Sequence, residues 1–203
     1  MTRGFPVLLA FVLLAGTAAL SVETGGFRVV TEAGARQLAV ERVPQMLPDA
    51  QLVDQDGRRF SLGAYKGRVL LVDFIYTRCP TICGALGENF AQVLQATDAA
   101  AARVPFDLLS ISFDRQTDDR AALRLYGERF GAKTPRWRIA SPIDDRTLDR
   151  LLKSFGVVVI PDGMGGFIHN DAVYVVDAGG RLARILDVDA PARLAAAALR
   201  AAP

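Results

Sequence analysis

Two long, mostly apolar runs constrain the fold of this chain more than any other feature of its sequence. Val69–Tyr76 reads VLLVDFIY and Val104–Asp114 reads VPFDLLSISFD. A strand that is apolar at nearly every position, rather than at alternate positions, is typical of a central parallel strand buried on both faces. Parallel neighbours must be joined by long crossovers, which are usually helices. The two runs therefore predict an α/β fold with a parallel core.

The rest of the chain alternates between helical and strand patterns. Helices are predicted over Pro80–Ala102, Thr117–Phe130, Asp144–Phe155 and Pro191–Ala201, and strands over Trp137–Ser141, Ala172–Asp177 and Arg181–Leu186. A hairpin over Ala50–Leu62, with its turn at Asp56-Gly57, precedes the first apolar run. The order predicts a sheet covered by helices on both faces, with an N-terminal β-hairpin extension.

The N-terminal segment reads as separate from this domain. In residues 1–22, Arg3 is followed by an uncharged, apolar stretch. Two interpretations stay open: a signal peptide, for which the small residues Thr17 and Ala19 suit cleavage, or an uncleaved membrane anchor. Arg3 favours a cytoplasmic N-terminus in both cases, so the rest of the chain is expected outside the cytoplasm. Residues 23–47 show no sustained period and predict a linker or arm.

Charge and cysteine content exclude several classes of protein. The 24 Lys and Arg residues nearly balance the 22 Asp and Glu residues, giving a net charge of +2. This balance argues against a nucleic-acid partner, which requires a basic excess or a basic face. The chain has 2 Cys and 1 His, so it is not a disulfide-rich scaffold. A four-ligand zinc site made of Cys and His alone cannot be built within one chain.

The cysteines form the strongest local motif. Pro80 suits the first position of a helix, which places Cys79 at the N-cap and Cys83 one turn later on the same face. The helix start and Arg78 both favour thiolates. At this spacing the Cα atoms lie about 6 Å apart, which predicts a strained, easily reduced disulfide or a pair that shares a soft metal. A purely structural disulfide would close a tiny loop and stabilise little.

The single histidine can complete a metal site. His169 lies near the glycine-rich stretch Gly163–Gly166, on the sheet edge predicted to carry the cysteines. Two thiolates and one imidazole suit copper, whereas a lone histidine is more commonly a solvated loop residue. Met164, in the same stretch, is either a fourth soft ligand or, more commonly, a packing residue.

Two aspartates follow or interrupt the apolar runs. Asp73 lies inside the first run. It is either a buried acid of raised pKa that moves protons during thiol chemistry, or a sign that one strand face is wetter than its pattern suggests. Asp114 follows the second run and is predicted to be a turn or helix-start residue before Thr117.

Three segments together carry a family resemblance. They read DQDGRRFSLGAYKGRVLLVDFIYTRCPTIC, SISFDRQTDDRAALRLYGERFGA and FIHNDAVYVVD, and they resemble the Sco/SenC family from about Pro48 to the C-terminus. The resemblance implies a thioredoxin-like fold over residues 48–203, on the periplasmic side of the inner membrane, anchored or secreted. It implies one copper per chain, as Cu(I) or Cu(II), with Cys79, Cys83 and His169 as ligands.

The resemblance also implies a function. Family members help assemble the CuA centre of cytochrome c oxidase, as copper donors, thiol reductants or both. The implied partner is the copper-bearing subunit of the oxidase or another copper protein. The chain is then a monomeric metallochaperone rather than an enzyme, bound to the membrane through its N-terminal segment if that is uncleaved. Thr81 and Gly84 depart from the acidic residue and the proline that many members carry.

A thiol–disulfide oxidoreductase of the thioredoxin type, acting on copper-site cysteines, is the alternative. Cys79 and Cys83 would then be the redox pair, with Asp73 as the proton relay. Thioredoxin-type enzymes usually have a two-residue spacer between the cysteines and a cis-proline before the antiparallel strand. Here the spacer has three residues and Phe167–Ala172 contains no proline, so the sequence favours copper binding. A thiol peroxidase is a weaker interpretation, because only Thr77 and Arg78 offer an activating environment.

Overall fold

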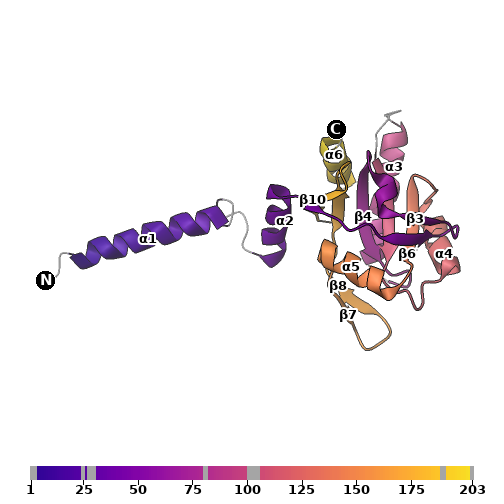
Figure 1. Ribbon diagram of the computed structural model, residues 1–203, viewed down its shortest axis with the longest axis horizontal. Helices are drawn as coiled ribbons and strands as arrows, with labels where there is room; N and C mark the ends of the chain where they lie inside the picture. The colour runs from indigo at the N-terminus through magenta and orange to yellow at the C-terminus, as the bar shows by residue number, and fades with distance from the viewer. Residues whose placement is uncertain are drawn as a thin grey trace. The chain divides into compact units, whose positions relative to one another are not determined.

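The computed structural model describes residues 4–23, 26, 31–79, 82–99, 106–187 and 191–201. The chain divides into two compact units, Met1–Val43 and Pro44–Pro203. In the described part of the second unit, the main sheet has eight strands in the order β1-β10-β9-β4-β5-β6-β2-β3 (Figure 1). Their bounds are β1 Gln45–Met46, β10 Arg181–Leu186, β9 Val173–Val176, β4 Val69–Ile75, β5 Phe106–Ser112, β6 Trp137–Pro142, β2 Gln51–Asp54 and β3 Arg59–Ser61.

The centre of the sheet follows the two apolar runs. Strand β4 pairs in parallel with β5, and β5 in parallel with β6, whereas β9 is antiparallel to β4. Every residue of β4 and β5 is buried, because helices cover both faces of the sheet. The predicted parallel core is therefore confirmed.

The predicted N-terminal hairpin is also confirmed. Strands β2 and β3 are antiparallel, and Gly57 takes the left-handed conformation (φ +80°) that their turn requires. Strand β2 also pairs with β6, so the hairpin extends the sheet at one edge. A single 3-10 turn, Leu62–Tyr65, follows and leads into β4.

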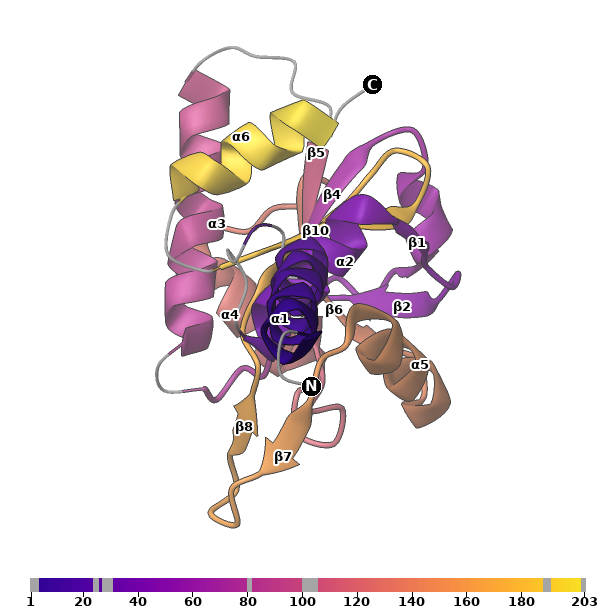
Figure 2. The same cartoon turned by 90° about the vertical axis from the view of Figure 1, so that its left-hand side faces the viewer.

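Four helices complete the second unit: α3 Ile82–Ala99, α4 Arg120–Phe130, α5 Asp145–Phe155 and α6 Pro191–Ala201. Helix α3 packs against α4 and α6, and these lie on one side of the sheet while α5 lies on the other (Figure 2). On the α5 side, the Phe155 ring contacts the rings of Phe74 and Tyr174. Since successive side chains of a strand alternate between faces, Asp73 points to the side that α3 covers.

Helix α4 begins later than the sequence predicts, and part of the helix predicted from Pro80 falls outside the described residues. The helix predicted from Thr117 begins at Arg120, because the Asp119 carboxylate accepts the Ala122 N–H at 2.9 Å and caps it there. It ends at Gly131 as predicted, in the left-handed conformation (φ +73°). Of the helix predicted over Pro80–Ala102, residues 80, 81 and 100–102 lie outside the described residues, as do residues 104 and 105 of the predicted second strand.

The first unit contains a helix where the sequence predicted a linker. Helix α2 spans Glu32–Arg42 and is capped by Thr31, whose hydroxyl accepts the Gly34 N–H at 3.1 Å. The sequence does not predict this helix, because it contains a glycine and its apolar residues show only a weak helical period. Helix α1, Gly4–Glu23, covers the segment interpreted as a signal or an anchor. Among the described residues, none of the helices combines the length and apolarity of a candidate membrane span.

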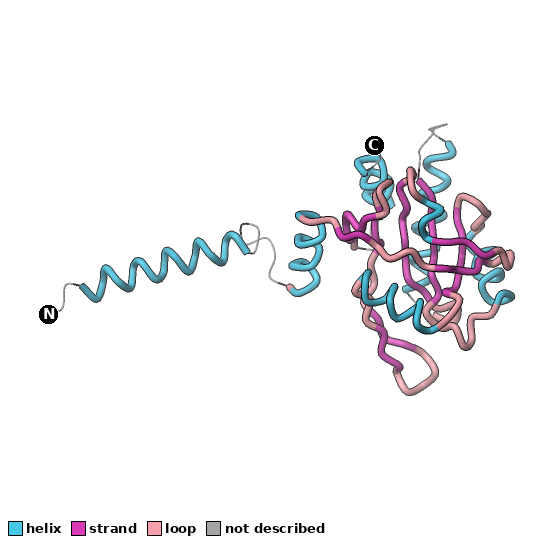
Figure 3. The backbone as a smooth tube through the Cα atoms, viewed as in Figure 1, coloured by secondary structure: helices cyan, strands magenta, loops and turns pink. Residues whose placement is uncertain are grey.

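A small second sheet replaces the loop predicted around the glycine-rich stretch. Strands β7, Val159–Pro161, and β8, Phe167–His169, pair antiparallel and extend away from the main sheet (Figure 3). The Asp162 carboxylate closes their turn by accepting the N–H groups of Met164 and Gly166 at 2.7 and 2.9 Å. Strands of three residues on either side of glycines are too short to show a period, so the sequence could not predict them.

Candidate metal centre

The carboxyl ends of β4 and β5 are tied together by one buried acid. Asp118 is 3% exposed. Its carboxylate accepts the Thr77 N–H at 2.9 Å, the Thr77 hydroxyl at 2.6 Å and the Ser112 hydroxyl at 2.6 Å. This arrangement fixes the loop that leads from β4 to Cys79. Asp118 is not among the residues predicted for the site, because an aspartate just before a helix is typical of an ordinary cap or turn.

The cysteines lie where the sequence predicted, at the carboxyl end of β4 and the start of α3. Both are thiols, and the Cys83 N–H donates to the Cys79 sulfur at 3.4 Å. Cys79 therefore holds a helix-capping position, although Pro80 and Thr81 between the two lie outside the described residues. Cys83 is 1% exposed and Cys79 9%. The Tyr126 hydroxyl donates to the Cys83 carbonyl at 2.7 Å, which links α4 to α3.

The prediction that both thiols are biased toward thiolate is wrong for Cys83. Burial raises the pKa of the Cys83 thiol far above its usual range, because a buried thiolate loses its hydration. The charge of Arg78 is also directed elsewhere, since its Nη2 lies 2.9 Å from a carboxylate oxygen of Asp114. The Asp114 carbonyl accepts the N–H groups of Thr117 and Asp118, so the predicted turn role is confirmed, and the ion pair is an added role.

His169 meets Cys83 across the site. Its Nε2 lies 4.0 Å from the Cys83 sulfur, and its ring packs against those of Tyr76 and Phe113. Its Nδ1 lies 3.0 Å from a carboxylate oxygen of Asp171. Burial lowers the pKa of His169, but Asp171, the charge of Cys79 and the Asn170 backbone together outweigh burial, and the net shift is upward. Nδ1 lies on the Asp171 side, close to its carboxylate but without the geometry of a hydrogen bond, so Nε2 is the ring nitrogen available to the sulfur side.

The hairpin that carries His169 is held at its base. The Asn170 side chain accepts the Val158 N–H at 2.7 Å and donates to the Gly156 carbonyl at 3.0 Å. The Phe167 ring packs against Tyr76 and Phe113. Met164, at the turn, is 88% exposed, so the interpretation of Met164 as a packing residue is wrong.

Asp73 lies on β4, on the face of the sheet that α3 covers, and its side chain is fully buried. Neither of its carboxylate oxygens has a hydrogen bond of good geometry within the described residues. Burial raises its pKa from 3.8 to about 7, and weaker contacts, including the Ser110 hydroxyl, oppose the rise. The interpretation of a wetter strand face is therefore wrong. The burial of Asp73 is confirmed, and its role as a proton carrier stays a prediction.

The donor set fits a soft metal ion. In the described part of the chain, no group of three or more His, Cys, Asp or Glu side chains is already drawn together around a metal position. Metal–ligand bonds are about 2.0 Å long to nitrogen and about 2.3 Å long to sulfur, so two such atoms bound to one ion lie at most about 4.3 Å apart. The 4.0 Å between His169 Nε2 and Cys83 Sγ is within this limit.

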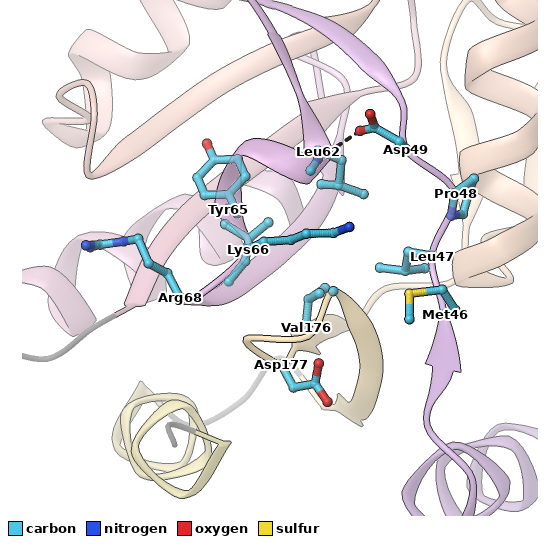
Figure 4. A pocket seen from close by; sticks show the side chains of 13 residues that line it. Met46, Leu47, Pro48, Asp49, Leu62, Tyr65, Lys66, Arg68, Val176 and Asp177 are labelled. Carbon is cyan, nitrogen blue, oxygen red and sulfur yellow. Dashed lines mark hydrogen bonds between the residues drawn. The ribbon is translucent and has the colours of Figure 1, made fainter.

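A separate cavity lies at the opposite edge of the sheet, where β4 begins and β9 ends (Figure 4). Leu62, Lys66 and Val176 are among its lining residues, and its volume is about 170 Å³. Asp49 fixes one wall by accepting the Gly63 N–H at 2.8 Å. Ligand pockets usually have volumes of about 300 Å³ or more. At about 170 Å³ this cavity is below that range.

Comparison with known proteins identifies the family. A family model described as SCO1/SenC matches residues 41–202. The chain belongs to the SCO1/SenC family. The SCO1 protein homolog of Bacillus subtilis (strain 168) is 28% identical over 131 residues, which cover 64% of this chain and 67% of that protein. The mitochondrial SCO2 homolog of Bos taurus is 30% identical over 121 residues, 56% of this chain but 46% of that protein.

Solved structures agree with this SCO1/SenC assignment. The copper-bound structure of Bradyrhizobium japonicum ScoI has a TM-score of 0.66 and 26% identity, covering 77% of this chain and 99% of that chain. A SCO1/SenC family lipoprotein from Bacillus anthracis str. Ames has a TM-score of 0.71 and 23% identity, covering 80% of this chain and 99% of that chain. The predicted family and the thioredoxin-like α/β fold are both confirmed.

Proposed function

We propose that this SCO1/SenC protein is a copper metallochaperone that holds one copper ion per chain through Cys79, Cys83 and His169. The observation that carries the proposal is the 4.0 Å approach of His169 Nε2 to the Cys83 sulfur, between residues 86 positions apart in sequence. A soft two-thiolate, one-imidazole set is suited to copper, and copper bound to ScoI of Bradyrhizobium japonicum supports the same cargo here.

The thiolates and the imidazole differ in their importance for the two oxidation states of copper. Cu(I) is soft and two thiolates can hold it, whereas Cu(II) prefers nitrogen donors and higher coordination. His169 therefore lets one site hold both states. Because the pKa of Cys83 is raised by burial, that thiol loses its proton when the metal binds rather than before. Asp171, 3.0 Å from Nδ1, holds the imidazole so that Nε2 can reach the ion.

The wider role is carried over from the family. We propose that the copper serves the CuA centre of cytochrome c oxidase, and that the partner is its copper-bearing subunit or another copper protein. Residues 1–22 act as the signal or anchor, residues 23–47 as an arm, and residues 48–203 as the copper-binding domain. The domain works as a monomer on the periplasmic side of the inner membrane.

Copper loading tests this proposal. The reduced full chain should bind one Cu(I), and on addition of Cu(II) it should show thiolate-to-copper charge-transfer absorption. His169→Ala should retain Cu(I) but lose that absorption, and Cys79→Ser should lose binding of both ions. Ile168→Ala, on the same strand but 65% exposed, is the matched control and should behave as the wild type. An unchanged Cu(II) spectrum in His169→Ala would remove His169 from the site.

The buried Asp73 favours a second activity at the same residues, reduction of a disulfide in the copper acceptor. The Cys79 thiolate attacks the acceptor disulfide to form a mixed disulfide, and Cys83 then displaces it. The acceptor is reduced to two thiols while Cys79 and Cys83 become a disulfide. Asp73 would accept the proton that Cys83 releases. Asp73→Asn should slow reduction of a test disulfide and leave one copper per chain; loss of copper would instead make Asp73 structural.

A further inference from the structure

One exposed face of α4, beside the cysteines, forms a groove that copper binding does not use. The groove has a volume of about 350 Å³ and is lined by Thr77, Arg78, Ala122, Leu125, Tyr126 and Arg129. Its floor reaches the candidate site, because the Tyr126 hydroxyl donates to the Cys83 carbonyl at 2.7 Å. Its near wall, Thr77 and Arg78, directly precedes Cys79. A molecule seated here would therefore lie beside the segment that leads into Cys79.

The groove combines an apolar centre with two cations. Leu125, which is 67% exposed, supplies the apolar part. Arg78 contacts Asp114 and Thr117 through Nη2, and the rest of its guanidinium faces outward, because half of the side chain is exposed. Arg129 stacks on the Phe130 ring, 5.1 Å from its centroid, and makes no ion pair within the described residues.

The nearby acids do not cancel these cations inside the groove. Asp119 and Glu128 line an adjoining depression that shares Leu125, and neither lines the groove itself. Asp114 offsets part of the Arg78 charge at 2.9 Å, but it is only 6% exposed and leaves the outward part of that guanidinium open. The surface beside the cysteines is therefore positively charged, mainly through Arg129, around an apolar residue. Arginine and exposed apolar side chains together are typical of the energetically important parts of protein interfaces.

We propose that this groove docks an acidic segment of the protein that exchanges copper with Cys79 and Cys83. An apolar side chain of that segment would cover Leu125, and carboxylates on either side would pair with Arg78 and Arg129. Arginine binds carboxylates in a planar, two-bond geometry, and complementary charge speeds association and fixes orientation. This inference rests on the proposed function, because it names the chemistry of the copper partner at the same site.

A peptide titration tests the docking surface. The probe is a capped peptide with an Asp-Leu-Glu centre between glycines, added to the isotope-labelled, reduced full chain and followed by NMR. We expect shifts confined to Thr77, Arg78 and the exposed face of α4. Arg129→Glu should weaken binding about ten-fold, since it replaces an attraction with a repulsion, and 0.5 M salt should also weaken binding by screening these charges.

The matched control is Arg146→Glu. Arg146 is exposed on α5, so this variant changes the net charge equally and should leave the affinity unchanged. Equal weakening by both variants would overturn the proposal, as would equal binding of a peptide with an Asn-Leu-Gln centre. Copper stoichiometry is measured on the same samples. If peptide binds but copper does not, the proposed function fails and the groove stands. If copper binds and the peptide does not, the groove alone fails.

Discussion

Asp73→Asn should change how the stability of this protein depends on pH. Asp73 lies on the central strand β4, is fully buried, and has no hydrogen bond of good geometry in the described structure. Burial raises its pKa from 3.8 to about 7, because the charged form loses its hydration. Asparagine has nearly the same shape and cannot ionise. We therefore expect wild-type stability to fall with rising pH in a range where the variant's does not.

The size of the effect follows from the pKa shift. Between pH 3.8 and about 7 the native state keeps a proton on Asp73 that the unfolded state has released. The free energy of unfolding therefore falls as pH rises through this range. The stabilisation is complete below pH 3.8 and is lost as pH rises through 7. At about 1.36 kcal/mol per pKa unit, the whole shift corresponds to about 4 kcal/mol, and the part between pH 4.5 and 8.5 to about 3 kcal/mol.

Urea unfolding of the reduced, metal-free chain measures this directly. The buried Trp137 reports unfolding by fluorescence, and both proteins are titrated at several values between pH 4.5 and 8.5. The difference between the free energies of unfolding, variant minus wild type, should increase by about 3 kcal/mol as the pH rises from 4.5 to 8.5. Groups common to both proteins cancel in the difference. His169 contributes to the pKa of Asp73, so the pair is also measured with His169→Ala. A pH-independent difference would refute the reasoning.

Two further predictions concern the packing around the site. Asp118→Ala removes the acceptor of three hydrogen bonds and should cost about 3–5 kcal/mol in urea unfolding. Asp119→Ala, which removes only a helix cap, should cost about 1 kcal/mol. Equal costs for the two variants would contradict the idea that Asp118 ties the ends of β4 and β5 together. Gly87→Ala would place its Cβ 2.6 Å from the Phe130 ring and should cost about 1–3 kcal/mol. Gly84→Ala, with nothing within 4 Å, should gain up to about 1 kcal/mol, and a similar gain for Gly87→Ala would show that Phe130 yields freely.

Local sequence was enough to predict the core of the sheet and the cysteine motif. The two apolar runs became β4 and β5, buried along their whole length, because a strand that is apolar at nearly every position can bury both of its faces only between two covering layers. The cysteines took neighbouring turns at the start of α3, since their relation depends on helix geometry alone. The hairpin turn at Gly57 and the helix end at Gly131 followed from left-handed glycines.

Tertiary packing decided what the site contains. No local pattern places His169 against Cys83; the approach depends on the short hairpin β7–β8, which is held by Asn170 and by packing of Phe167 on Tyr76. Likewise, no local pattern distinguishes Asp118 from an ordinary helix-start residue. Asp118 matters to the site because the ends of two strands both donate hydrogen bonds to its carboxylate.

Burial was the other quantity that the sequence could not supply. At the start of a helix, local electrostatics favours a thiolate, but Cys83 is 1% exposed and the loss of hydration reverses that preference. For Asp73 the sequence left two environments open, and only the packing of α3 over β4 chose the dry one. Periodicity and turn chemistry act over a few residues and can be read from the sequence. Desolvation and ligand geometry depend on segments far apart in the chain, and so only the tertiary structure determines them.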